Sequence, residues 1–179
     1  MPWDWTLVLV HHPRSVVVVT TDTLVQIPVR LDVEAAAPTF LKAMSRLDAA
    51  AVHELDRAGI EPGLRELVRL RASQLNGCAY CVDTHARDAA AVGEPEQRIR
   101  AVAVWREAPF FTARERAALA LTDAVTRLSE THVPDDVHAE AAAHFTDEEL
   151  AALLTLVVTI NAWNALSLAS RSWAPQRRW

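Results

Sequence analysis

The segment that most constrains the fold begins at Thr146, because it predicts a helix with almost no polar face. Glu149 follows Thr146 at the spacing of a capping box, which marks a helix start. Apolar side chains then cover nearly the whole circumference: Leu150, Leu153, Leu154, Val157, Val158, Ile160, Trp163, Leu166 and Leu168. A helix that is apolar all round must be buried, either inside the domain or between subunits.

Proline and glycine divide the preceding residues into further helical segments. Pro38 suits a first helical position, and Asn76-Gly77 is a pair that tolerates the left-handed conformation and ends helices. A second capping box, Thr112 with Glu115, opens another helix. The expected segments are 38–59, 62–76, 78–93, 95–105, 112–128 and 134–145, before the final one. In the segment 95–105, Ile99, Val102 and Ala103 are expected to point inward. The prediction is an all-α domain of about six to seven helices over residues 31–173.

The two ends of the chain differ from this domain. Residues 1–30 hold two β-branched apolar runs, 7–10 and 16–19, separated by His11-His12-Pro13-Arg14. They favour an accessory or disordered extension, irregular or β-like, although a small hairpin or pairing with another chain remain alternatives. Residues 174–179 are expected to be a frayed tail. We place no function in either end.

Composition narrows the function classes and the compartment. The net charge is −5, and no basic run or glycine-rich phosphate loop is present, so nucleic acid is not an expected partner. No uninterrupted apolar stretch of about 20 residues occurs and the N-terminus lacks a secretory signal pattern, so no membrane association is expected. Two cysteines in 179 residues are not a disulfide scaffold. A cytoplasmic location follows as the expectation.

The reactive chemistry is concentrated where the third helix begins. Cys78 and Cys81 stand in a C-x-x-C directly after Asn76-Gly77, and His85 follows one turn beyond Cys81. Unpaired backbone N–H groups and the helix dipole favour a thiolate at such a helix start. His85 projects from the same face as Cys81 and can act as its base. Two such thiols can also close a disulfide and be reset by an external dithiol.

Two other interpretations of this pair stay open at this point. The cysteines can be inert core residues, or they can bind zinc with His85, although a structural zinc site needs a fourth ligand. A histidine from elsewhere in the chain would have to supply it. A thioredoxin-like fold is disfavoured because no βαβ pattern surrounds the motif.

The spacing Glu66-(eleven residues)-Cys78-x-x-Cys81-x-x-x-His85 resembles the signature of the alkyl hydroperoxidase AhpD-like proteins, within the carboxymuconolactone decarboxylase-like family. The helix ahead of the cysteines (64–78) and the segment 160–164 are also similar to that family, and the resemblance covers roughly residues 28–173. It implies an all-helical fold, thiol-dependent reduction of hydroperoxides without a cofactor, and assembly as a homo-oligomer (a trimer, dimer or hexamer). It also implies an external dithiol reductant, of lipoyl type or another small dithiol.

The resemblance assigns roles by position. Cys81 attacks the peroxide, Cys78 resolves the sulfenic acid as a disulfide, and Glu66 with His85 forms a proton relay. One residue departs from the pattern: Tyr80 stands where the best-studied branch has a histidine, and a phenol cannot replace imidazole as a base at neutral pH.

The leading hypothesis is therefore a thiol-dependent peroxidase, an antioxidant oxidoreductase that acts on peroxide as acceptor. Two alternatives are an enzyme of the carboxymuconolactone decarboxylase type, in which the cysteines are incidental, and a non-enzymatic redox-sensing helical protein.

Overall fold

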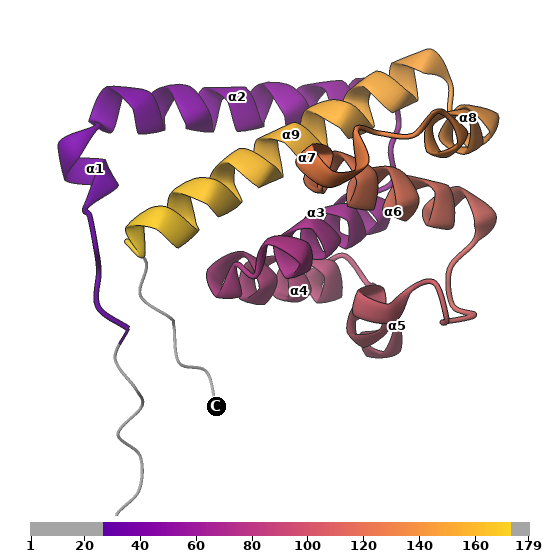
Figure 1. The fold of residues 1–179 in the computed structure, drawn as a ribbon, viewed down its shortest axis with the longest axis horizontal. Coiled ribbons are helices and arrows are strands. Elements are labelled where there is room, and N and C mark those ends of the chain that lie inside the picture. Colours follow the sequence, from indigo (N-terminus) through magenta and orange to yellow (C-terminus); the bar gives the residue numbers. More distant parts are fainter. Residues whose placement is uncertain (1–26, 173–179) are drawn as a thin grey trace, which may run out of the picture.

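Figure 1 shows the computed structural model of the chain, which describes residues 27–172. Its α-helices are α1 (Val33–Ala36), α2 (Pro38–Arg57), α3 (Pro62–Asn76), α4 (Ala79–Ala91), α5 (Glu96–Ala101), α6 (Ala113–Thr126), α7 (Leu128–Thr131), α8 (Asp135–His144) and α9 (Asp147–Ser170). A 3-10 helix, η1 (Val102–Val104), follows α5 directly. Within residues 27–172 no strand is present, so the all-α prediction is confirmed. The single-turn helices α1 and α7 add to the seven longer ones.

Four helices follow one another from top to bottom of Figure 1, each packed on the next: α2, α9, α3 and α4. The helix α6 packs on α3, α8 and α9, and it lies to the right of α3 in Figure 1. Because α3 contacts α4, α6 and α9, it is the central helix of the fold.

The apolar residues of α3 divide between two buried clusters. Leu64 and Val68 belong to a cluster shared with α2, α6, α8 and α9, whereas Leu67 and Leu70 belong to a second one shared with η1 and α6. This division leaves Glu66, Arg69 and Ser73 as a polar strip at helical spacing between the clusters. Glu66 and Ser73 on this strip are buried, and Arg69 is half-buried.

Local signals place most helix ends as the sequence predicts. Both capping boxes form: the hydroxyls of Thr112 and Thr146 accept from the N–H groups of Glu115 and Glu149, whose carboxylates accept in return. Gly77 ends α3 with φ of 72°, in the left-handed region where a Cβ is strained.

The expected helix 95–105 is wrong in its second half. The α-helix stops at Ala101 and continues as η1, with the carbonyl of Ala103 accepting from Arg71 Nη1 at 2.9 Å. A 3-10 turn has three residues per turn, so it shifts the phase of the side chains that follow. Val102 remains buried, but Ala103 is exposed where the sequence predicted an inward position.

The apolar helix α9 is only partly covered. Leu153, Leu156 and Val157 are buried, whereas Leu154 is 36% exposed and Val158 56%. Among the described helices, α9 alone has the length and hydropathy to cross a membrane, with a mean hydropathy of 1.6 and 44% of that window buried inside the structure. Burial within a single copy therefore accounts for one side of α9 and not for the other.

The ends of the described chain meet at the last turn of α9. The backbone N–H groups of Arg30 and Leu31 both donate to the carbonyl of Ser170, at 2.8 and 3.0 Å. Residues 27–32 are not helical. The predicted β-like runs at 7–10 and 16–19 and the predicted frayed tail lie outside the described residues.

Candidate active site

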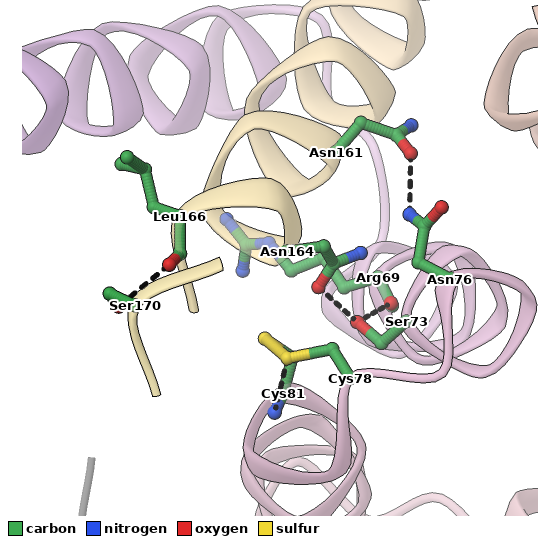
Figure 2. The surroundings of a disulfide bond; sticks show 9 residues. All are labelled: Arg69, Ser73, Asn76, Cys78, Cys81, Asn161, Asn164, Leu166 and Ser170. Carbon is green, nitrogen blue, oxygen red and sulfur yellow. Dashed lines mark hydrogen bonds between the residues drawn. A yellow bond between two sulfur atoms is a disulfide. The ribbon is translucent and has the colours of Figure 1, made fainter. Parts of the chain in front are cut away.

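The two cysteines sit at the junction between α3 and α4. After the left-handed turn at Gly77, Cys78 is the N-cap of α4, and its sulfur accepts from the backbone N–H of Cys81 at 3.4 Å. The Cα atoms of Cys78 and Cys81 are 5.4 Å apart and their sulfurs are joined as a disulfide (Figure 2). Both cysteines are buried, with 1% and 4% of their surface exposed.

Glu66 reaches this junction from the polar strip of α3. Its Oε2 lies 2.9 Å from Nδ1 of His85 on α4, and its Oε1 accepts from Arg69 Nη1 at 2.7 Å. Burial alone would raise the pKa of Glu66, but the hydrogen bonds and charges of His85 and Arg69 outweigh it and hold that pKa below its usual value. An ionised carboxylate only accepts, so Nδ1 of His85 is the donor in this hydrogen bond.

A pocket of about 370 Å³ opens beside His85 and Arg69. Cys81 and His85 line it, and Cys78 is not among its lining residues. Four helices supply the remaining walls: Asp48 from α2, Arg69 from α3, Tyr80, Thr84 and Asp88 from α4, and Ile160, Trp163 and Ser167 from α9. The pocket volume lies within the range of small-molecule sites.

Polar side chains of α9 hold the end of α3 that leads into the cysteines. Ser73 Oγ lies 3.2 Å from Oδ1 of Asn164 and 2.7 Å from the carbonyl oxygen of Arg69, while Asn76 Nδ2 donates to Oδ1 of Asn161 at 2.7 Å (Figure 2). Asn164 is fully buried, and its Nδ2 has no hydrogen-bond partner in the described part of the chain. Because Asn161 and Asn164 are one turn apart, α9 fixes the position of the α3–α4 junction at two points.

The structure brings together all four residues that the sequence proposed. Glu66, predicted only through the family spacing, is 7% exposed rather than a solvated helix residue. Sequence reasoning missed the pocket residues Asp48, Asp88 and Arg69, which come from three helices. For Arg69 a signal existed, since it is spaced three residues from Glu66 and four from Ser73 on one face of α3.

The grouping of possible metal ligands differs from the zinc alternative. In residues 27–172 the group of three such side chains is Glu66, His85 and Asp88, whose ligating atoms lie within 4.8 Å of one another. The cysteines are bonded to each other and take no part in it. Since Arg69 already donates to Glu66, a cation there would compete with a guanidinium.

Comparisons with known proteins place this site in a family. Residues 38–124 match the profile of the carboxymuconolactone decarboxylase family, a range that holds Glu66, Cys78, Cys81 and His85. A crystal structure of a protein of unknown function from Agrobacterium tumefaciens, proposed to be the antioxidant defence protein AhpD, is 38% identical with a TM-score of 0.78; the match covers 84% of this chain and all of that one. The chain belongs to the carboxymuconolactone decarboxylase family.

Two further similar proteins are a sequence relative and a solved structure. The uncharacterized protein YdfG of Bacillus subtilis is 38% identical over 113 residues, which are 63% of this chain and 77% of YdfG. The debrominase Bmp8 has a TM-score of 0.67 at 20% identity, covering 78% of this chain and 72% of Bmp8. At that identity the likeness shows the fold alone. The AhpD-like helical fold implied by the sequence is thereby confirmed.

Proposed function

We propose that this family member is a thiol-dependent peroxidase, an antioxidant oxidoreductase that reduces alkyl hydroperoxides through Cys78 and Cys81. The observation that carries the proposal is that Cys81 and His85 line one pocket, while Nδ1 of His85 is hydrogen-bonded to Glu66. A thiol, a base and a carboxylate that orients the base form the minimum device for activating a nucleophile.

The first step oxidises Cys81. His85 takes the thiol proton at Nε2, because Nδ1 is committed to Glu66. The thiolate attacks the terminal oxygen of the hydroperoxide, so an S–O bond forms and the O–O bond breaks. The sulfur becomes a sulfenic acid, and the electron pair of the broken bond leaves on the alkoxide oxygen. That oxygen takes the proton from His85 and departs as the alcohol.

The second step closes the disulfide. Cys78 sulfur attacks the sulfenic sulfur of Cys81, so an S–S bond forms, the S–O bond breaks and hydroxide leaves with the Cys78 proton as water. The N–H of Cys81 points at Cys78 sulfur, which favours its anionic form. A small dithiol of lipoyl type then reduces the disulfide by exchange and is itself oxidised to a cyclic disulfide.

The assignment of Cys81 as the attacking thiol is supported by its place in the pocket wall. Cys78 is the more buried of the two cysteines; it is the N-cap of α4 and does not line the pocket. The Cα separation of 5.4 Å in the closed disulfide lies in the usual range for such bonds.

Thiol titration tests the proposal. Reduced protein given one equivalent of cumene hydroperoxide should lose both thiols, and the Cys81→Ser variant should consume no peroxide. The Cys78→Ser variant should consume one equivalent and stop at the sulfenic acid. Retention of both thiols by the wild-type protein would overturn the proposal. Dihydrolipoamide, thioredoxin and glutathione, supplied in turn, identify the reductant by continued peroxide consumption.

A double variant, Cys78→Ser/Cys81→Ser, separates this function from the alternatives. Lactone decarboxylation should survive in it, since that chemistry does not use the cysteines. Oxidation-dependent association of the wild-type protein without peroxide turnover would favour the redox-sensing interpretation.

We also propose that the protein works as a homo-oligomer in the cytoplasm. The uncovered side of α9, with Leu154 and Val158, supports association, because one copy leaves this apolar surface in water. A reducing compartment is supported by the need to reset the thiols. A Val158→Glu variant should lower the mass measured by analytical ultracentrifugation.

A further inference from the structure

The pocket over Cys81 has an apolar wall and an acidic one. Ile160 and Trp163 of α9 form the apolar part, which suits an organic substituent rather than bare hydrogen peroxide. Asp48 of α2 and Asp88 of α4 line the same pocket from different helices. Asp48 is half-buried and Asp88 exposed, and a carboxylate oxygen of Asp88 lies within 4.8 Å of a ring nitrogen of His85.

These two carboxylates are not neutralised. Neither side chain makes a hydrogen bond or an ion pair with any residue between 27 and 172. The cation that lines the pocket is Arg69, and its guanidinium donates to Glu66 Oε1 at 2.7 Å. The side chains of Arg69 and Glu66 are only 14% and 10% exposed, so their charges are matched to each other. An incoming molecule therefore meets two uncompensated negative charges beside the reactive sulfur.

We propose that Asp48 and Asp88 make the pocket selective for uncharged or cationic organic molecules and against carboxylates. This inference rests on the proposed function for its substrates: neutral alkyl hydroperoxides would be reduced in preference to hydroperoxides that carry a carboxylate. The same selection applies to the reductant, because the sulfur that faces the pocket is that of Cys81. A neutral dithiol such as dihydrolipoamide should reset the enzyme faster than anionic dihydrolipoate.

The size of the effect follows from the position of the charges. An anionic molecule a few ångströms from two carboxylates, near a protein surface and at low salt, is repelled by both. This repulsion lowers its binding or encounter constant by about tenfold or more. Screening by salt should remove most of this selectivity, since both carboxylates are at least partly in contact with water.

Alkylation of Cys81 tests the charge of the pocket without any peroxidase activity. In the Cys78→Ser variant Cys81 is the one thiol left in the chain. Its thiolate displaces iodide from iodoacetamide, which is neutral, or from iodoacetate, which is anionic. The rate with iodoacetamide is divided by the rate with iodoacetate, and this ratio is divided by the same ratio for free N-acetylcysteine. The normalised ratio measures the preference of the pocket for a neutral reagent. We expect a normalised ratio of about ten or more at low salt.

Three further variants, made in the same Cys78→Ser background, assign the selectivity. Asp48→Asn/Asp88→Asn should bring the normalised ratio close to one. Asp83→Asn removes one negative charge from α4 outside the pocket, where Asp83 pairs with Arg87 at 3.3 Å, and should leave the ratio high. Arg69→Gln should not lower the ratio, because Arg69 is occupied by Glu66.

Two results would overturn the inference: a ratio near one in the Cys78→Ser parent, or a ratio that the added Asp48→Asn/Asp88→Asn changes do not alter. A faster reaction with iodoacetate would assign the pocket to anion binding by Arg69. The same comparison can be made with substrates, by measuring how fast the wild-type protein reduces neutral cumene hydroperoxide and its anionic 4-carboxy derivative. The neutral compound should be reduced faster. If neither is reduced while alkylation remains selective, the peroxidase proposal fails and the selectivity stands.

Discussion

The carboxylate of Asp123 offers a sharp test of what holds α3 in place. It is buried on α6 and accepts from Arg71 of α3 twice, from Nε at 2.5 Å and from Nη2 at 3.1 Å. Arg106 also donates to it, and Trp105 Nε1 lies 3.4 Å away. The change to make is Asp123→Asn, which keeps the shape and removes the charge.

The expected loss follows from burial. The Arg71 and Asp123 side chains are 10% and 8% exposed, so the variant leaves a buried guanidinium with the carbonyl of Ala103 as its remaining strong acceptor. Removing one partner of a buried ion pair costs about 3–5 kcal/mol. Arg106 is 57% exposed and should add little, because water replaces its partner. For a chain of 179 residues the loss corresponds to a fall in Tm of roughly 6–20 °C.

Urea unfolding of three variants provides the assay. Asp56→Asn is the matched control, since Asp56 meets Arg65 at 2.6 Å but its side chain is 63% exposed, and it should cost less than about 1 kcal/mol. The double variant Arg71→Met/Asp123→Leu should recover most of the loss, because it leaves no buried charge unpaired. A single variant no less stable than the Asp56→Asn control would refute the reasoning.

Acid gives an independent check on the same pair. Burial raises the pKa of Asp123, but Arg71 and Arg106 more than offset this and hold it below the ordinary 3.8. A group whose pKa is depressed by folding adds stability above its ordinary pKa. It loses that stability as the pH falls through the folded pKa. The difference between wild type and Asp123→Asn should therefore be constant at neutral pH and shrink below about pH 3.8.

Three more outcomes are expected. Glu66→Gln removes the charge that orients His85 and should lower the rate of peroxide consumption by about 10²–10⁴-fold in a steady-state assay, with both thiols still titratable. Gly63→Ala would place a Cβ 2.1 Å from Glu94 Oε1, the end of a flexible side chain that can turn away, and should therefore cost no more than about 1 kcal/mol in urea unfolding. The Cys78–Cys81 disulfide closes a short loop, so the oxidised protein should be more stable than the reduced one by at most about 2 kcal/mol when melted with and without reductant.

Much of the fold could be predicted from local chemistry. The two capping boxes, Pro62 and Gly77 mark helix ends through contacts within a few residues, which a sequence displays directly. The α5–η1 break could not be found this way, because the carbonyl of Ala103 bonds Arg71, 32 residues earlier in the chain.

The candidate site shows the same division. The spacing of Cys78, Cys81 and His85 predicted that they lie together at the start of one helix, and the family resemblance predicted Glu66. The acidic wall could not be predicted from the sequence, since Asp48 and Asp88 are 40 residues apart. They line the same pocket only because α2 and α4 both border it. Likewise Asp123 reads as one more polar residue of α6 until the partner on α3 is known.

The hydrogen bond from Cys81 N–H to Cys78 sulfur makes α4 a built-in indicator of the redox state. A thiolate is a stronger acceptor than a disulfide sulfur, so reduction should strengthen this bond and slow the exchange of the Cys81 amide hydrogen with solvent. The Cys81 amide would then exchange more slowly in the reduced protein than in the oxidised one. Exchange of this one backbone amide could thus report the redox state of the cysteine pair.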